Sequence, residues 1–208
     1  MTDVVPPRQA GLTHPANMLT ITRLVLAPYL FWLVLDARDT RGVSWAAFGL
    51  GVALASTDFF DGKVARRANV VSRSGAFLDP LADKVVILGS GFALVEVGRY
   101  WWFPVTIMAV RELGITAWRT KLAREGLAVP ARRSAKYKTF VQGVALAMAV
   151  MPTLETADTA IVVALWAAVA WTVFTGLQYL LDGQNATSTT GSPTSTNGSP
   201  TSTTGGPG

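Results

Sequence analysis

Six apolar stretches, each close to the length that crosses a lipid bilayer, constrain this chain more than any other feature. They cover residues of about 18–36, 43–60, 76–97, 101–120, 137–153 and 159–181. A helix needs about 20 mainly apolar residues to cross the hydrocarbon core. The pattern therefore predicts an all-α integral membrane protein with six transmembrane helices.

The composition agrees with this prediction. Half of the 208 residues are hydrophobic and only 15% are charged, a balance that is rare in water-soluble domains of this size. The net charge of +5 comes from basic clusters between the apolar stretches. We therefore expect membrane lipids, and not nucleic acid, as partners. There is no cysteine, and the single histidine, His14, lies near the N-terminus, so we expect oxygen ligands for any metal.

The distribution of Lys and Arg predicts the orientation in the membrane. Two connections are rich in these residues, at 63–73 and 119–138, whereas the opposite connections carry only Arg38, Arg41 and Arg99. Because basic loops stay on the cytoplasmic side, we expect the two basic connections and both termini in the cytoplasm. The chain would then be a multi-pass protein of the cell membrane.

The two ends of the chain differ from the apolar centre. Residues 1–16 contain prolines and a glycine without periodicity, which predicts a loose cytoplasmic arm. Residues 17–182 would form the six-helix membrane domain. Residues 183–208 are a Ser, Thr, Gly and Pro tract that cannot bury a core, which predicts a disordered tail.

Four aspartates stand at the cytoplasmic ends of the second and third apolar stretches. Asp58 and Asp61 are three residues apart, and Asp79 and Asp83 are four apart, so each pair shares one face of a helix. Charges near a bilayer cost several kcal/mol unless they are paired, hydrated or coordinated. Such a cluster suits hard cations, and we expect Mg²⁺ or Mn²⁺, with two ions bound. The alternative is salt bridging to neighbouring cations, namely Arg66, Arg67 and Lys84.

A longer pattern includes these aspartates. The run Asp58-x-x-Asp61-Gly62-x-x-Ala65-Arg66, eight residues, Gly75-x-x-x-Asp79-x-x-x-Asp83 resembles, at all eight positions, the signature of the CDP-alcohol phosphotransferase family. The resemblance covers residues of about 16–181. It implies a six-helix membrane enzyme, usually a homodimer, whose acidic cluster binds two divalent ions over the pyrophosphate of a CDP-linked donor.

The resemblance also implies roles for the matching residues. Asp58, Asp61 and Asp79 would be metal ligands, and Asp83 would be both a ligand and the general base. Residues expected to border the CDP group are Asp58, Gly62, Ala65, Arg66, Asn17 and Thr20. The functional interpretation places Asn17, Thr20 and Arg23 near the donor. The alternative is that Asn17 is an N-cap, Thr20 carries a hydroxyl on a helix face and Arg23 reaches the membrane surface.

Three further segments, 77–84, 111–112 and 136–142, are similar to the glycerol phosphate branch of the family. This implies transfer of a phosphatidyl group from CDP-diacylglycerol to glycerol 3-phosphate, with release of CMP. A phosphorylated acceptor needs cations near the metal site, and those expected are Arg111, Arg119, Lys136 and Lys138. Alternatively, each of these cations could serve only to set the orientation of the chain in the membrane. Glu112 could form a buried ion pair with Arg111 and orient its guanidinium.

Other functions remain open. Within the family, transfer to inositol phosphate or cardiolipin synthesis would use the same donor chemistry. A divalent-cation transporter is the alternative from another class, because carboxylates inside a membrane also mark ion pathways. The acids gather at one surface and do not line a path across the membrane, which favours the enzyme.

Overall fold

The computed structural model describes residues 15–68, 73–124 and 134–190. Within these ranges the chain is helical and contains no strand, which confirms the predicted all-α class for this part of the chain. Two short 3-10 helices, η1 (Arg38–Thr40) and η2 (Pro152–Leu154), lie in turns. The longer elements are α1 (Pro15–Asp36), α2 (Trp45–Ala68), α3 (Arg73–Glu96), α4 (Trp102–Arg124), α5 (Ser134–Val150) and α6 (Asp158–Thr190).

One boundary differs from the prediction. The tail was expected from residue 183, but α6 continues to Thr190, so residues 183–190 belong to the helix. Once a helix is nucleated, each added residue contributes a backbone hydrogen bond, and a polar composition alone does not end it. The remainder of the predicted tail and residues 1–14 of the predicted arm lie outside the described residues.

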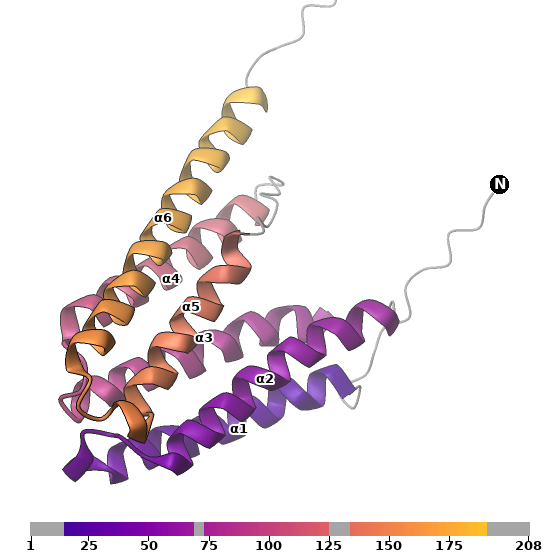
Figure 1. The fold of residues 1–208 in the computed structure, drawn as a ribbon. Helices are drawn as coiled ribbons and strands as arrows, with labels where there is room; N and C mark the ends of the chain where they lie inside the picture. Colours follow the sequence, from indigo (N-terminus) through magenta and orange to yellow (C-terminus); the bar gives the residue numbers. More distant parts are fainter. Residues whose placement is uncertain (1–14, 69–72, 125–133, 191–208) are drawn as a thin grey trace, which may run out of the picture.

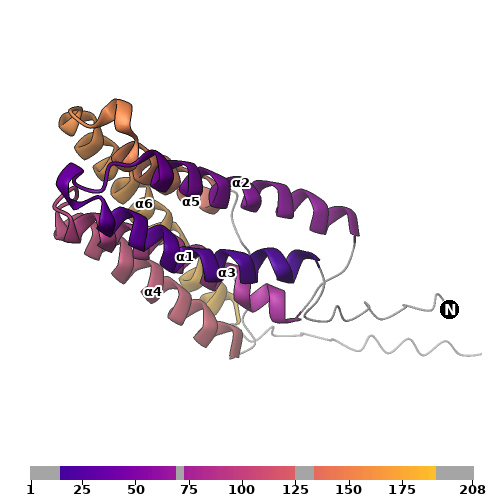
Figure 2. The same cartoon turned by 90° about the horizontal axis from the view of Figure 1, so that it is seen from below.

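Three turns gather at one end of the molecule, here called the turn end (residues 37–44, 97–101 and 151–157). Figures 1 and 2 show the helices converging there and spreading apart toward the opposite end. The backbone N–H of Ser44 donates to the carbonyl of Val150 at 3.0 Å, which ties the first turn to the last. The N-terminal ends of α1, α3 and α5 therefore lie at the opposite end of the bundle.

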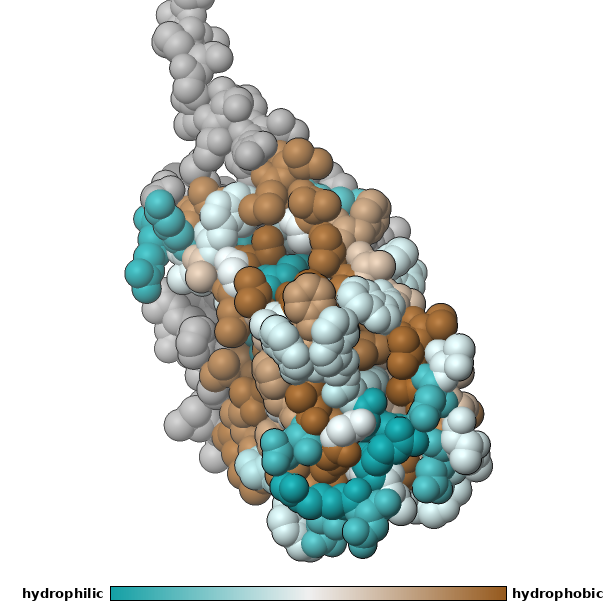
Figure 3. Space-filling model, turned by 90° about the vertical axis from the view of Figure 1, so that its left-hand side faces the viewer, coloured by the Kyte–Doolittle hydropathy of each residue, from teal (hydrophilic) through white to brown (hydrophobic). Residues whose placement is uncertain are grey.

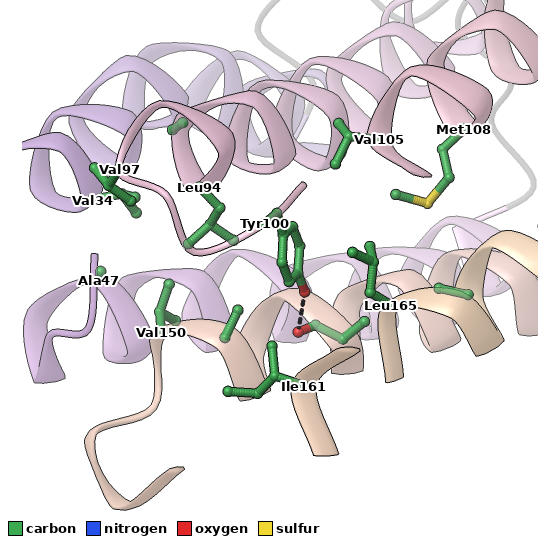
Figure 4. Packing of buried hydrophobic residues seen from close by; sticks show 14 of the residues in the cluster. Val34, Ala47, Leu94, Val97, Tyr100, Val105, Met108, Val150, Ile161 and Leu165 are labelled. Carbon is green, nitrogen blue, oxygen red and sulfur yellow. Dashed lines mark hydrogen bonds between the residues drawn. The ribbon is translucent and has the colours of Figure 1, made fainter. Parts of the chain in front are cut away.

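The apolar core lies between the helices near the turn end. Leu94, Val105 and Ile161 are essentially inaccessible to solvent, and Figure 4 shows their side chains among neighbours from several helices. Tyr100 enters this core and donates its O–H to the carbonyl of Ala145 at 2.7 Å. Burial raises the pKa of the Tyr100 phenol, so the group stays protonated and keeps this hydrogen bond.

The outer surface is largely apolar. Figure 3 shows a broad hydrophobic face with hydrophilic residues gathered at its lower end, and exposed apolar side chains include Val110, Leu113, Phe174 and Leu177. Such a surface is typical of contact with a membrane or a protein partner. Among the described residues, one helical segment, Asp158–Leu181, is long and apolar enough to cross a bilayer. The number of α-helices in the described ranges matches the prediction, whereas the six membrane spans are not confirmed.

The contact between α1 and α3 depends on a glycine. A Cβ atom at Gly89 would lie 2.2 Å from Cζ of Phe31, so the Phe31 ring packs directly on the α3 backbone. We expect Gly89→Ala to lower the free energy of unfolding by about 1–3 kcal/mol, because the ring must move. Thermal or denaturant unfolding in detergent would measure this change.

A second glycine provides the control. Nothing lies within 4 Å of a Cβ built at Gly49, so Gly49→Ala should be neutral or stabilise the protein by up to about 1 kcal/mol through helix propensity. The Phe31→Ala background should remove most of the cost of Gly89→Ala. Equal destabilisation by Gly89→Ala in both backgrounds would contradict the proposed ring contact.

Candidate functional site

The four signature aspartates lie on two helices. Asp58 and Asp61 belong to α2, and Asp79 and Asp83 belong to α3, so the helical spacing predicted for each pair is present. Asp83 is the signature aspartate whose side chain the structure describes. Several predicted site residues have side chains outside the described set, namely Asn17, Asp58, Asp61, Gly62, Ala65, Arg66, Asp79 and Lys136.

Asp83 is paired with an arginine from α1. The Nη1 atom of Arg23 donates to Oδ1 of Asp83 at 3.1 Å. The arginine is only 4% exposed, so protein encloses its side chain, and its position relative to the membrane surface stays a prediction. The side chain of Asp83 remains 37% exposed, and its carboxylate is accessible to a ligand. Thr20, one helical turn before Arg23, is also buried.

A cavity of about 150 Å³ adjoins Asp83. Its walls come from α3, α4 and α5, with polar groups from each helix. The lining residues are Asp83, Lys84, Ile87, Leu88, Glu112, Lys138, Thr139 and Gln142. Lys138 and Gln142 are four residues apart on α5 and therefore share the face that borders the cavity. The cavity thus brings together the expected base, two lysines, a hydroxyl and an amide.

Glu112 connects two of the expected cations. Its carboxylate accepts a hydrogen bond from Nη1 of Arg111 at 3.1 Å and forms an ion pair with Nζ of Lys138. All three side chains are largely buried. The predicted buried pair of Arg111 and Glu112 is confirmed. A buried charge that loses its partner is strongly unfavourable. Because Glu112 is the partner of Lys138, it holds the lysine side chain in place.

Arg111 lies behind the cavity and is not among its lining residues. Its Nη2 atom donates to Oγ1 of Thr175 on α6 at 2.8 Å. A Cβ atom at Gly176 would be 2.8 Å from Nε of Arg111, so the glycine allows the guanidinium to pass close to α6. Arg111 thus joins α4 to α6 and contributes its charge to the cavity through Glu112.

Cations outnumber carboxylates among the described groups around the cavity. These groups comprise four cations, Arg23, Lys84, Arg111 and Lys138, and two carboxylates, Asp83 and Glu112. The side chains of the three other signature aspartates lie outside the described set. A phosphate monoester carries between one and two negative charges near neutral pH, so its charge complements the lysines that line the cavity.

Arg119 lies elsewhere. Its guanidinium carbon is 5.5 Å from the centre of the Tyr179 ring on α6, which is the geometry of a cation–π contact. Arg119 is exposed and does not line the cavity. Of the cations expected to bind the acceptor, Lys138 therefore lines the cavity, Arg111 lies behind it, Arg119 faces Tyr179, and the Lys136 side chain is outside the described set.

The sequence did not predict the contacts of three residues in this arrangement. Arg23 was expected near the donor but not in contact with Asp83. Lys84 was expected only as a salt-bridge partner, and Gln142 only as part of a segment similar to the glycerol phosphate branch. Helical spacing could have indicated two of them. Arg23 follows Thr20 by three residues and Gln142 follows Lys138 by four, so each shares a helix face with a residue already assigned to the site.

Comparisons with known proteins point to one family. The sequence matches the family model described as CDP-alcohol phosphatidyltransferase over residues 13–175. It is 37% identical over 177 residues to a probable phosphatidylglycerophosphate synthase of Mycobacterium tuberculosis, an alignment that covers 83% of this chain and 82% of that protein.

Two other similar proteins are named CDP-diacylglycerol–glycerol-3-phosphate 3-phosphatidyltransferase. The protein of Escherichia coli is 35% identical over 171 residues, which cover 79% of this chain and 91% of that protein. The protein of Bacillus subtilis is 30% identical over 191 residues, which cover 84% of this chain and 97% of that protein.

Proposed function

This chain belongs to the CDP-alcohol phosphatidyltransferase family, and from this premise we propose that it transfers a phosphatidyl group from CDP-diacylglycerol to glycerol 3-phosphate, forming phosphatidylglycerol phosphate and CMP. The names of the similar proteins in Escherichia coli and Bacillus subtilis support this donor and this acceptor. The observation that carries the proposal is the cavity beside Asp83, which Lys84 and Lys138 line and which Arg111 adjoins through Glu112. Such a site suits a small phosphorylated alcohol.

Divalent cations are part of the proposal. Asp58, Asp61, Asp79 and Asp83 would hold Mg²⁺ or Mn²⁺, two ions in all, because the donor set consists of carboxylate oxygens at helical spacing. Among the residues with described side chains, no group of three or more His, Asp or Glu gathers at one point, and the other three aspartates lie outside that set. When bound, such ions supply charge neutralisation and polarisation at the phosphate being transferred.

The chain's own residues would perform the remaining steps. Asp83 takes the proton of the attacking hydroxyl, and Arg23, which donates to Oδ1 at 3.1 Å, orients the carboxylate. Lys84 and Lys138 hold the acceptor phosphate, and Arg111 adds charge through Glu112. We assign Asn17, Thr20, Asp58, Gly62, Ala65 and Arg66 to the CDP end of the donor. Arg119 and Lys136 would act at the outer approach to the acceptor site.

The proposed setting is the cell membrane. The six α-helices would each cross the bilayer, with the turn end outside and both termini and the active site on the cytoplasmic side. The alternation of the helices and the gathering of three turns at one end support this arrangement. The protein would act as a homodimer, as the family resemblance implies.

Release of CMP tests the proposal. Purified protein in detergent is supplied with CDP-diacylglycerol and Mg²⁺ or Mn²⁺, and separately with glycerol 3-phosphate, inositol 1-phosphate, myo-inositol, serine or phosphatidylglycerol. We expect metal-dependent release with glycerol 3-phosphate at least about tenfold faster than with the others, because a site that pairs each polar group of its substrate rejects analogues that leave groups unpaired.

The other outcomes are informative. Preferential turnover of inositol 1-phosphate would keep the metal mechanism and change the acceptor. Release with phosphatidylglycerol alone would indicate cardiolipin synthesis. Absence of metal-dependent release with every acceptor would contradict the proposed function.

A further inference from the structure

Gln142 is a buried amide at the wall of the cavity. Its side chain is only 3% exposed, and it lies one helical turn beyond Lys138 on the same face of α5. Both residues line the cavity, together with Asp83 and Lys84 from α3. A buried polar group is costly unless all its hydrogen-bonding atoms are paired. The partners of Gln142 therefore indicate what the cavity is built to receive.

Two contacts fix which way the amide points. Nε2 of Gln142 donates to Oγ1 of Thr172 at 3.0 Å and lies 3.7 Å from Sδ of Met108. A thioether sulfur accepts hydrogen bonds and cannot donate them, so the NH₂ group of the amide is on the side of α4 and α6. Thr172 is fully buried, which leaves its hydroxyl little freedom to release this contact.

The amide carbonyl is therefore the group left for the cavity. Within the described part of the chain, no donor is hydrogen-bonded to Oε1 of Gln142, and this atom is not among the fully buried unpaired atoms. An amide oxygen can accept two hydrogen bonds. The described lining of the cavity thus combines lysines at 84 and 138, carboxylates at Asp83 and Glu112, the hydroxyl of Thr139 and the uncharged carbonyl of Gln142.

We propose that Gln142 determines acceptor specificity by accepting a hydrogen bond from the acceptor hydroxyl that does not react. The inference rests on the proposed function. Glycerol 3-phosphate has three polar features, a phosphate, a reacting hydroxyl and a second hydroxyl. Lys84 and Lys138 would bind the phosphate, and Asp83 would take the proton of the reacting hydroxyl. The carbonyl of Gln142 would accept a hydrogen bond from the second hydroxyl. Thr172 is a positioning residue, because it acts on the substrate only through the orientation of the amide.

The test compares two acceptors that differ in one hydroxyl. Glycerol 3-phosphate has the second hydroxyl, and 3-hydroxypropyl phosphate lacks it while keeping the phosphate and the primary alcohol. In the wild-type protein we expect the ratio of kcat/KM for the two acceptors to be about 10 to 100. In Gln142→Leu the ratio should fall to near 1, with the KM for CDP-diacylglycerol unchanged.

Two further variants complete the design. Thr172→Val keeps the shape of the side chain but removes the hydroxyl, and it should lower the ratio severalfold. It therefore carries the test if Gln142→Leu does not fold. Gln178→Leu is the matched control, because Gln178 lies on α6 and does not line the cavity, and it should keep the wild-type ratio.

The outcomes separate this inference from the proposed function. A wild-type protein that does not use glycerol 3-phosphate would overturn both. A wild-type protein that uses it, with Gln142→Leu and Thr172→Val slowing both acceptors equally, would overturn the inference alone and leave Gln142 a structural residue. A collapse of the ratio in Gln142→Leu, with the control unchanged, would establish the specificity role.

Discussion

Asp83→Asn is expected to lower kcat for CMP release by about 10²- to 10⁴-fold or more, the range that a positioned general base contributes. Asparagine has nearly the same shape and can still accept a hydrogen bond from Arg23, which donates to Oδ1 at 3.1 Å. It cannot take a proton and is a weaker ligand for a hard cation. The substitution therefore removes the chemistry of Asp83 while disturbing the packing of α1 against α3 very little.

A second aspartate gives the control for this prediction. Asp36 lies at the C-terminal end of α1, near the turn end, and is exposed, so Asp36→Asn should retain wild-type activity. Raising the Mg²⁺ or Mn²⁺ concentration separates the two roles of Asp83. Recovery of most of the activity at high cation concentration would indicate a ligand role only. Activity of Asp83→Asn close to wild type at ordinary concentrations would refute both roles.

The helices and the family could be predicted from the sequence because both depend on local information. The apolar stretches set most helix ends from α1 to the start of α6 to within about four residues, whereas α2 continues beyond its predicted end at residue 60 to Ala68. The eight signature positions identified the family, which the match over residues 13–175 confirms. The extension of α6 to Thr190 was missed, because composition predicts burial and not the propagation of helical hydrogen bonds.

The partners of the charged residues could not be predicted, because they depend on which helices pack together. Arg23 and Asp83 are 60 residues apart in sequence, and neither helix alone indicates that they meet. The buried pair of Arg111 and Glu112 was predicted since the two residues are adjacent on a helix. The contact of Glu112 with Lys138 was not, because it joins α4 to α5.

Arg99 shows the same limit at the turn end. Sequence analysis counted it only as one of three basic residues on the non-cytoplasmic side. In the fold its side chain is 1% exposed and joins two turns that are about 50 residues apart. It donates to the carbonyls of Ala149, Leu154 and Glu155 at 2.9–3.1 Å and to Oδ1 of Asp158 at 2.9 Å.

Arg99→Ala is therefore expected to lower the free energy of unfolding by about 3–5 kcal/mol, the cost of removing one partner from a buried charged network. The alanine leaves the carbonyls of Ala149, Leu154 and Glu155 without the guanidinium donor, although Leu154 still accepts from the N–H of Ala157, and Asp158 keeps its ion pair with Arg41. Thermal unfolding in detergent should show a large decrease in Tm. Arg99→Lys should restore little of it, because one ammonium group cannot reproduce the fork of guanidinium donors.

A neighbouring arginine makes the comparison decisive. Arg38 also lies at the turn end and pairs with Glu96 at 3.4 Å, but the two side chains are 61% and 63% exposed. Exposed pairs contribute less than about 1 kcal/mol, so Arg38→Ala should leave Tm almost unchanged although it removes the same charge. If both alanine variants unfold alike, the stabilisation is a general effect of positive charge at this end. If only Arg99→Ala is destabilised, its hydrogen bonds to the turn at 151–157 hold α5 and α6 together, and with them the α5 face that lines the cavity.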